Sequence, residues 1–98
     1  MNSSNILIIG TGNRAISHVI PAAKITFNNI YLNGSNPKKT LSYARKFLLN
    51  PIVSLDENSL KNINNIYLAV PESSYIEILN NLKKISYSSN FNIYIEIP

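Results

Sequence analysis

The sequence predicts an α/β fold: a doubly wound parallel sheet of about five strands in three α/β/α layers. Short apolar or alternating segments recur along the chain, most are followed by apolar residues at helical spacing, and the first breaks into a glycine-rich turn. Strands separated by helical crossovers run parallel, and their right-handed connections place helices on the faces of the sheet. The 98 residues have room for one small domain with a single modest core.

The first strand and the first helix are expected over residues 5–10 and 13–25. Residues 5–10 are mostly apolar, which is typical of a strand buried on both faces in a parallel sheet. The helix carries apolar residues at helical spacing. Pro21 falls inside this pattern and is expected to kink or shorten the helix, because proline lacks the N–H that a helix interior needs.

The second strand is expected over residues 29–33, and a dense turn cluster follows it. Asn36 and Pro37 are a favourable N-cap and first-turn pair, because Asn accepts from a free backbone N–H and proline needs no partner there. The helix that they open is expected to end near Leu48. Its predicted inward face consists of Leu41, Ala44, Phe47 and Leu48.

The middle of the chain predicts a third and a fourth strand with a short helix between them. The third strand is short and falls within residues 50–54. Asp56 is expected to cap a brief helix that runs through Leu60 and Ile63. The fourth strand is expected over residues 65–70.

The last part of the chain predicts one more helix and one more strand. Pro71 ends the fourth strand, and Ser73 or Ser74 is expected to cap the helix that follows. The apolar stripe of this helix consists of Ile76, Leu79, Leu82 and Ile85. Alternation over residues 91–97 predicts the fifth strand.

Residues 10–15 read Gly-Thr-Gly-Asn-Arg-Ala and lie between the first strand and the first helix. This is the form of a Rossmann-like dinucleotide-binding turn, in which Gly10 permits the tight turn, Gly12 lets the backbone approach a pyrophosphate, and Ala15 lets helix and strand pack closely. The helix directs its unpaired N–H groups and the positive end of its dipole at the phosphates. The alternative is a tight turn without a ligand, with Arg14 an ordinary exposed residue. The candidate cofactor contacts are Gly10, Thr11, Gly12, Asn13, Arg14 and Ala15.

The end of the second strand predicts the adenosine side of the cofactor site. A domain specific for NAD usually places Asp or Glu here, against the ribose 2′-hydroxyl. Asn33 is neutral, and Ser35, Lys38 and Lys39 follow it with hydroxyl and ammonium donors. Because no carboxylate repels a 2′-phosphate, NADP is favoured over NAD. The alternative is that both lysines are ordinary first-turn residues of the helix.

Val70 and Pro71 end the fourth strand at the carboxyl edge of the sheet, where ligands collect in such folds. Strand termination alone also accounts for Pro71. Glu72 and Glu96 lie near the same edge, and we interpret them as solvated or hydrogen-bonded residues rather than general bases. Val70, Pro71 and Glu96 complete the candidate cofactor contacts. His18 has no carboxylate or nucleophile at a spacing typical of a catalytic pair, so we interpret it as a packing residue. No catalytic residue is assigned.

Composition excludes several functional classes. With no cysteine and one histidine, the chain has no disulfide, no thiolate metal site, no cysteine nucleophile and no cluster of histidine metal ligands. Its net charge of +4 and pI of about 9.5 come from scattered lysines and arginines, which indicate a solvated basic surface rather than a nucleic-acid partner. No apolar stretch approaches the roughly 20 residues that span a bilayer. The first residues lack the positive region of a signal peptide, so we expect a cytoplasmic protein without membrane contact.

The chain also resembles the Gfo/Idh/MocA oxidoreductases, and three segments carry the resemblance. Residues 10–15 with His18 are similar to the family's Gly-x-Gly-x-x-Gly/Ala-x-x-His. Residues 69–78, Ala-Val-Pro-Glu-Ser-Ser-Tyr-Ile-Glu-Ile, resemble its Ala-Thr-Pro-Pro-Asn-Ser-His-x-Glu-x segment. Residues 96–98, Glu-Ile-Pro, stand in the place of its Glu-Lys-Pro. The similarity extends over the whole chain.

The resemblance implies an N-terminal Rossmann domain that binds NAD or NADP, followed by an α/β domain with substrate and oligomer contacts. Residues 1–98 then look like the first domain alone, and a strand that stops at Pro98 without a covering helix supports a fragment of a longer two-domain protein. The implied reaction is hydride transfer between the nicotinamide and a sugar- or polyol-like substrate. In the family, the second domain usually supplies the acid/base residue.

The departures from the family concern its chemistry more than cofactor binding. Ile97 replaces the family's lysine, and an aliphatic side chain neither donates a hydrogen bond nor stabilises developing negative charge. Tyr75 and Ser73 replace its His and Asn. Two alternatives stay open: a non-catalytic relative that binds nucleotide as a sensor or scaffold, and another Rossmann-type module that binds a nucleotide sugar or S-adenosylmethionine. The second usually carries an acidic residue where this chain has Asn33.

Overall fold

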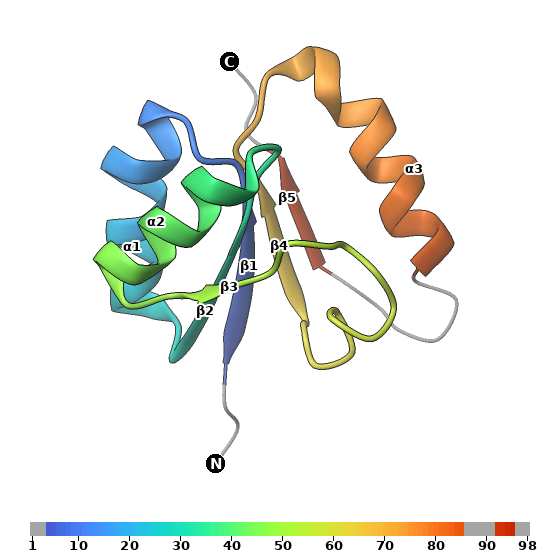
Figure 1. Cartoon of the computed structure of the whole chain (residues 1–98). Helices are drawn as coiled ribbons and strands as arrows, with labels where there is room; N and C mark the ends of the chain where they lie inside the picture. Colours follow the sequence, from blue (N-terminus) through green and yellow to red (C-terminus); the bar gives the residue numbers. More distant parts are fainter. Residues whose placement is uncertain (1–3, 86–91, 96–98) are drawn as a thin grey trace.

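The computed structural model describes residues 4–85 and 92–95, and within them it has a five-stranded sheet in which all strands run parallel. The strands lie in the order β3-β2-β1-β4-β5 (Figure 1). The predicted doubly wound sheet is confirmed, although residues 91, 96 and 97 of the predicted fifth strand lie outside the described residues. The bounds are Asn5–Ile9 for β1, Asn29–Asn33 for β2, Asn50–Pro51 for β3, Asn65–Leu68 for β4 and Asn92–Ile95 for β5.

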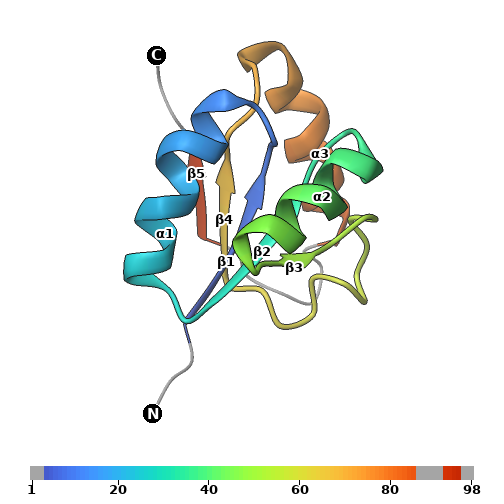
Figure 2. The same cartoon turned by 60° about the vertical axis from the view of Figure 1, so that its left-hand side comes forward.

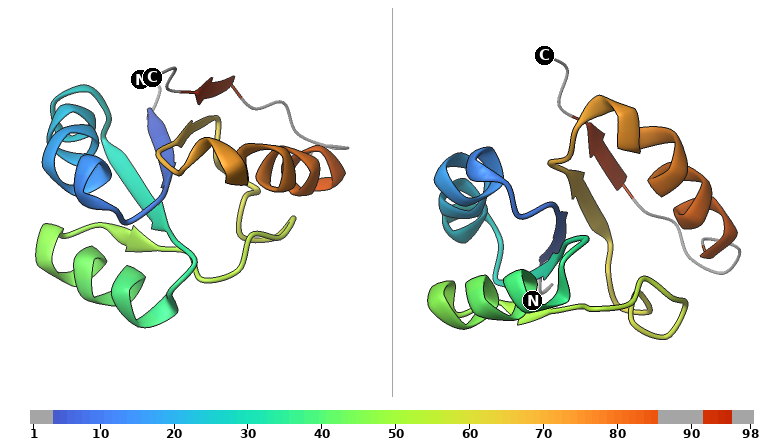
Figure 3. Two further views of the ribbon diagram at one scale, coloured as in Figure 1. Left: turned by 90° about the horizontal axis from the view of Figure 1, so that it is seen from above. Right: turned by 45° about the horizontal axis from the view of Figure 1, so that its top comes forward.

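Helices cover both faces of the sheet. The first helix contains a π-helical turn, η1 (Ala15–Val19), and continues as α1 (Ile20–Thr26); it shares one face with α2 (Pro37–Phe47). The opposite face carries α3 (Tyr75–Ile85), as Figures 1 and 3 show. From β1 the chain runs outward to β2 and β3, and then returns to β4 on the other side of β1. This reversal places a topological switch point at the carboxyl end of β1, where open α/β sheets bind ligands.

Strand β1 is the centre of the core. All five of its residues are buried, because helices pack over both of its faces. Ile6 and Ile8 belong to the apolar cluster under α1 and α2, whereas Leu7 and Ile9 belong to the cluster under α3. The apolar run in the sequence predicted this burial on two sides.

The first helix accommodates its proline through a widened turn. Residues 13 and 14 are helical, and in the π-helical turn that follows, the Ile20 N–H donates to the Ala15 carbonyl oxygen. Pro21 has no N–H to donate, so the regular hydrogen-bond pattern is interrupted there, and the wider turn lies immediately before it. Of the predicted kink or shortening at Pro21, the shortening does not occur, because the helix continues to Thr26 (Figure 2), and its irregularity is the π-helical turn.

The connection from β3 to β4 does not form the brief helix predicted after Asp56. Residues 53–64, all of them described, form turns instead. Asp56 accepts a hydrogen bond from the Ser59 N–H at 2.8 Å, as a cap does, but no regular helix follows. Leu60 and Ile63 are buried all the same, at 1% and 2% exposed. The spacing that predicted a helix therefore reflects the burial of these two side chains.

The buried face of α2 is rotated from the predicted one. Ala44 is buried and Phe47 is half-buried, as predicted, but Leu41 is exposed and Thr40 takes the inward position. Leu48 is 86% exposed, because it lies beyond the last turn as the C-cap, with a left-handed φ of 59°. The periodicity identified the helix correctly, but two of the four inward positions are wrong.

Helix α3 begins at Tyr75, directly after Ser74, which is one of the two predicted caps. A 3₁₀ turn, η2 (Glu72–Ser74), precedes it and contains both serines. Ile76 is 75% exposed, because the first turn of α3 directs it away from the sheet. The rest of the predicted stripe packs against the core and consists of Leu79, Leu82 and Ile85.

The helices are short, and α2 and α3 have 11 residues each. In the part of the chain that the structure describes, no helix has the length and apolar character needed to cross a membrane.

Candidate functional site

The turn between β1 and the first helix requires glycine at position 10. Gly10 has a φ of +136°, a backbone conformation that side chains rarely adopt. Its N–H donates to the Asn33 carbonyl oxygen at 2.7 Å, and a Cβ on it would collide with the carbonyl oxygen of Ala69. Gly10 therefore lets the ends of β1, β2 and β4 come together.

Gly12 is a glycine that the fold itself does not require. A Cβ built there would meet no atom of the described residues within 4 Å. The carbonyl oxygen of Gly12 accepts the Ile16 N–H at 3.1 Å and so joins the helix that runs from residue 13 to Thr26. Open space therefore lies in front of Gly12 at a helix N-terminus, where backbone N–H groups and the helix dipole favour anions.

A cleft of about 370 Å³ lies at the carboxyl ends of β1, β2 and β4. The loops that follow these three strands meet at the upper edge of the sheet in Figure 1. The glycine turn, the β2–α2 loop, the segment after β4 and the loop after β3 all contribute residues to its lining. The cleft thus occupies the switch point that the topology defines.

Most of the predicted cofactor contacts line this cleft. They converge because the carboxyl ends of parallel strands meet at one edge of the sheet. Their contact with a cofactor stays a prediction. The predicted residues in the lining are Gly10, Thr11, Gly12, Asn33, Ser35, Val70 and Pro71.

Other predicted contacts lie elsewhere. Asn13 and Arg14 are exposed in the first helical turn and do not line the cleft. Ala15 is fully buried in the core under the first helix, so it serves close packing of helix and strand rather than contact with a ligand. Glu96 lies outside the described residues.

The start of α2 brings Lys39 to the cleft, whereas the predicted contact Lys38 is exposed outside its lining. Successive residues of a helix differ by about 100° around its axis, so only one of the two lysines takes the cleft side. The predicted N-cap is confirmed, because Asn36 Oδ1 accepts the Lys39 N–H at 3.2 Å. Lys39 Nζ lies 5.9 Å from the ring centre of Tyr43, within cation–π range, and Ser35 lines the cleft beside it.

Several cleft residues were missed by the sequence-based reasoning. A Cβ on Gly34 would lie 2.8 Å from Thr11 Cγ2, so glycine lets the β2–α2 loop close on the glycine turn. Ser74 and Ile78 reach the cleft from η2 and α3, and Leu55 reaches it from the turns after β3. The turn cluster around Gly34 was a usable signal. Nothing in the periodicity pointed to Leu55.

Asn33 differs most from its predicted role. It is 6% exposed, and its Nδ2 donates to the Ile52 carbonyl oxygen at 2.6 Å, with a longer contact of 3.5 Å to the Val53 carbonyl oxygen. Its own carbonyl oxygen accepts the Gly10 N–H. The amide donors of Asn33 are therefore committed to the backbone after β3 rather than presented to a ligand.

A buried hydroxyl lies behind the same loop. Thr40 is fully buried, and its Oγ1 has no hydrogen-bond partner among the described residues. It faces Gly34, since a Cβ there would lie 3.0 Å from this oxygen. A buried hydroxyl without a partner destabilises a fold by about 1–3 kcal/mol.

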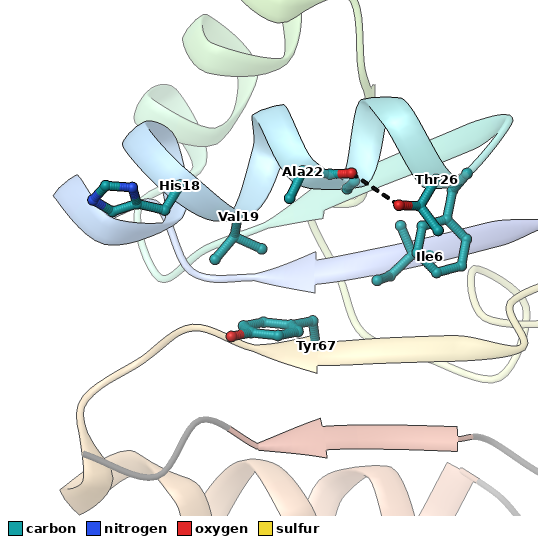
Figure 4. A pocket seen from close by; sticks show the side chains of 8 residues that line it. Ile6, His18, Val19, Ala22, Thr26 and Tyr67 are labelled. Atoms are coloured by element: carbon teal, nitrogen blue, oxygen red, sulfur yellow. Dashed lines mark hydrogen bonds between the residues drawn. The ribbon is translucent and has the colours of Figure 1, made fainter.

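A second hollow of about 270 Å³ lies between the first helix and the sheet (Figure 4). Its lining is mainly apolar and includes Ile6, Val19 and Tyr67, and none of the predicted cofactor contacts lines it. His18 borders this hollow but is exposed, so its predicted packing role is wrong. The π-helical turn that contains His18 changes the angular positions that regular helical spacing predicts. The cleft at the switch point is therefore the candidate site.

No protein-family model matches the chain, and no curated protein matches it. Solved structures do match its fold. KijD10, a 3-ketoreductase from Actinomadura kijaniata in complex with NADP and TDP-benzene, matches with a TM-score of 0.76 at 15% identity over 99% of this chain. A pyrroline-5-carboxylate reductase from Coxiella burnetii matches with a TM-score of 0.74 at 23% sequence identity over 96% of this chain. The UDP-N-acetylglucosamine 3-dehydrogenase GnnA from Acidithiobacillus ferrooxidans matches with a TM-score of 0.72 at 16% sequence identity over 100% of this chain.

These likenesses show that the fold is Rossmann-like. The chain spans only 30% of KijD10, 35% of the Coxiella reductase and 30% of GnnA. At identities of 14–23% among the similar structures, the shared property is the fold.

Proposed function

We propose that residues 1–98 are the NAD(P)-binding domain of an oxidoreductase that transfers a hydride between a nicotinamide cofactor and a sugar- or polyol-like substrate. One observation carries the proposal: Gly12, which the fold does not require, leaves open space at a helix N-terminus beside the cleft at the switch point. The fold shared with KijD10, whose structure holds NADP, and with the dehydrogenase GnnA supports it.

The residues around this space fit a dinucleotide. A pyrophosphate needs hydrogen-bond donors and close access to the backbone. The first-turn N–H groups of the helix supply the donors, and Gly12 leaves the access open. Apolar side chains of the cleft, including Leu55, Val70 and Pro71, suit a planar base. A bound nicotinamide would supply the hydride chemistry, while this chain binds and orients the cofactor.

We favour NADP over NAD on the basis of the residues near the end of β2. Among the described residues that line the cleft there is no Asp or Glu, whereas Lys39 and Ser35 offer a cation and a hydroxyl. A 2′-phosphate gains from charge-assisted hydrogen bonds of this kind. The neutral Asn33 contributes only by carrying no charge, because its amide donors bond elsewhere.

In this proposal, a second domain of a longer protein supplies the substrate site and the acid/base residue. KijD10 and GnnA, which share the fold, are about three times as long as this chain, which supports this division. The partners are then a small-molecule substrate, bound through the second domain, and further copies in a homo-oligomer.

A non-catalytic nucleotide sensor is a second candidate function. Ile97 favours it, because an aliphatic residue stands where the family that the chain resembles has a lysine near the nicotinamide. Replacement of Ile97 by lysine in the longer protein separates the two functions. An inactive parent that gains activity supports the sensor, whereas an active parent contradicts it.

Titration of NADPH and NADH against the chain tests cofactor binding. We expect saturable binding of both, followed by nicotinamide fluorescence, with a lower Kd for NADPH. S-adenosylmethionine and a UDP-sugar serve as controls, because other Rossmann-type modules bind them. Absence of saturable binding of either dinucleotide up to millimolar concentration would overturn the proposal, and preferential binding of a control ligand would replace it.

A further inference from the structure

Asn33 fastens a loop to the end of β2. Its Nδ2 donates to the Ile52 carbonyl oxygen at 2.6 Å in a buried bond that joins residues 19 positions apart. The Ile52 N–H donates in turn to the Leu32 carbonyl oxygen at 2.8 Å. These two bonds hold residues 52–53 against β2, immediately before the segment that carries Leu55 into the cleft.

We propose that Asn33 is a positioning residue: by holding the loop of residues 52–59, it places Leu55 as the wall against which the adenine base of the bound nucleotide packs. The inference rests on the proposed NAD(P) binding. It assigns Asn33 no contact with the ribose. The choice between NADP and NAD then depends on contacts from Lys39 and Ser35, and Asn33 contributes to it only by carrying no charge.

Ser59 holds the other end of the same loop. Its hydroxyl donates to the Ser54 carbonyl oxygen at 2.7 Å, and its N–H donates to Asp56 Oδ1 at 2.8 Å. The Asp56 N–H donates back to Ser59 Oγ at 3.1 Å. These bonds close residues 54–59 into a compact turn that contains Leu55.

The side-chain hydrogen bonds of Asn33 and Ser59 hold this connection in place of a crossover helix. A helix would hold its residues through internal backbone hydrogen bonds, but residues 53–64 form turns without that regular ladder. Leu60 and Ile63 anchor the later part of the connection in the core. The part that borders the cleft has instead the side-chain bonds of Asn33 and Ser59.

The wall that Leu55 completes is apolar and lines the same cleft as Ser35 and Lys39. Leu55, Val70 and Ile78 line the cleft and pack against one core cluster. Ser35 and Lys39 line the same cleft from the β2–α2 loop and the start of α2. A base near these two residues is the one attached to the ribose that carries the 2′-phosphate, and that base is adenine. Contact with the wall removes its ring from water.

A double-mutant cycle measured with NADPH tests whether Asn33 acts through Leu55. Asn33→Leu keeps the approximate size of the side chain and removes its donors, and Leu55→Ala removes the wall. We expect Asn33→Leu to raise the Kd about fivefold in the parent chain, and less than about twofold in the Leu55→Ala background. Equal increases in both backgrounds would overturn the proposal. Val53→Ala is the control in the same loop, because Val53 is 50% exposed and does not line the cleft.

Fragments of the cofactor separate a positioning role from a ribose contact. We expect Asn33→Leu to weaken adenosine 5′-monophosphate and to leave nicotinamide mononucleotide unchanged. The ratio of the Kd values of NADH and NADPH should also stay unchanged, because both cofactors carry the same base. A shift of this ratio in Asn33→Leu would show that Asn33 reads the ribose and would overturn the proposal.

Hydrogen exchange supplies a readout that needs no ligand. We expect faster exchange of the amides of residues 52–59 in Asn33→Leu, with unchanged exchange in β1 and α3. Unchanged exchange in the loop would overturn the positioning role. If Asn33→Leu fails to fold, Ser59→Ala opens the loop from its other end with the same expectations. Failure of the proposed function gives a different result from failure of this inference, because no dinucleotide then binds the parent chain. The adenine wall would be rejected in that case. The exchange experiment would still decide whether Asn33 holds the loop.

Discussion

The backbone of Gly10 lies against the carbonyl oxygen of Ala69 so closely that no side chain fits between them. The Ala69 N–H also donates to the Ile9 carbonyl oxygen at 2.9 Å, immediately before Gly10. The edge of the cleft is thus built from backbone groups of neighbouring strands. A substitution at this edge should therefore lower the stability of the fold where glycine is required sterically. Where glycine is not required, it should weaken ligand binding instead.

Gly10→Ala should lower the free energy of unfolding by at least about 3 kcal/mol, because it combines a strained positive φ with a collision against backbone that cannot move aside. Urea unfolding followed by circular dichroism measures the effect. Gly34→Ala is the matched control: the three atoms nearest to a Cβ there would be side-chain atoms of Thr11 and Thr40, at 2.8–3.0 Å, and Gly34 has no positive φ. A loss in Gly10→Ala no larger than in Gly34→Ala would contradict the steric explanation.

Gly12→Val should leave stability within about 1 kcal/mol of the parent, because the new side chain enters open space. The same space is the proposed pyrophosphate site, so we expect the Kd for NADPH to rise at least about tenfold. Parallel urea unfolding and fluorescence titration separate the two effects. Unchanged NADPH binding in a folded Gly12→Val variant would place the ligand elsewhere.

Lys39→Ala should raise the Kd for NADPH about tenfold and change that for NADH less than about twofold, because a charge-assisted bond to the 2′-phosphate is lost. Lys38→Ala is the control, since Lys38 is exposed and does not line the cleft. Added salt should reduce the NADPH preference of the parent chain through screening. Equal effects of the two lysine variants would indicate a general charge effect instead of a specific contact.

Thr40→Val should raise the free energy of unfolding by about 1 kcal/mol, because it replaces a buried hydroxyl that lacks a partner among the described residues with a methyl group of similar size. Urea unfolding is the measurement, and Thr40→Ala, which leaves a cavity, should lower stability instead. A loss of stability in Thr40→Val would contradict the absence of a favourable partner for this hydroxyl.

Rules that act over a few residues predicted the framework well. The apolar run before Gly10 predicted a strand buried on both faces, and Asn36 followed by Pro37 predicted the start of α2. Both depend on contacts within one turn or one strand, so the sequence around each position contains the necessary information. The placement of Gly10 and Gly12 between strand and helix follows for the same reason.

Features that depend on long-range contacts were not predictable in this way. Leu60 and Ile63 are spaced as on a helix, yet they are buried from a series of turns. Asn33 bonds to a carbonyl 19 residues away, and this bond redirects its amide from the predicted ligand to a loop. Lys38 and Lys39 are the same residue type at neighbouring positions. Only the rotation of α2 against the sheet decides which of them lines the cleft.

Apart from the brief helix expected after Asp56, the sequence by itself determined the succession of strands and helices, the parallel sheet and the glycine turn between the first strand and the first helix. Periodicity, capping and turn chemistry are local, and each has a definite pattern. The tertiary structure alone decided which of the candidate residues share the cleft and which further residues join them. It brought Leu55 and Lys39 into the lining and placed Ala15 in the core. The physical reason is that packing and hydrogen bonds between distant segments set the direction of each side chain, and those partners are specified only once the chain has folded.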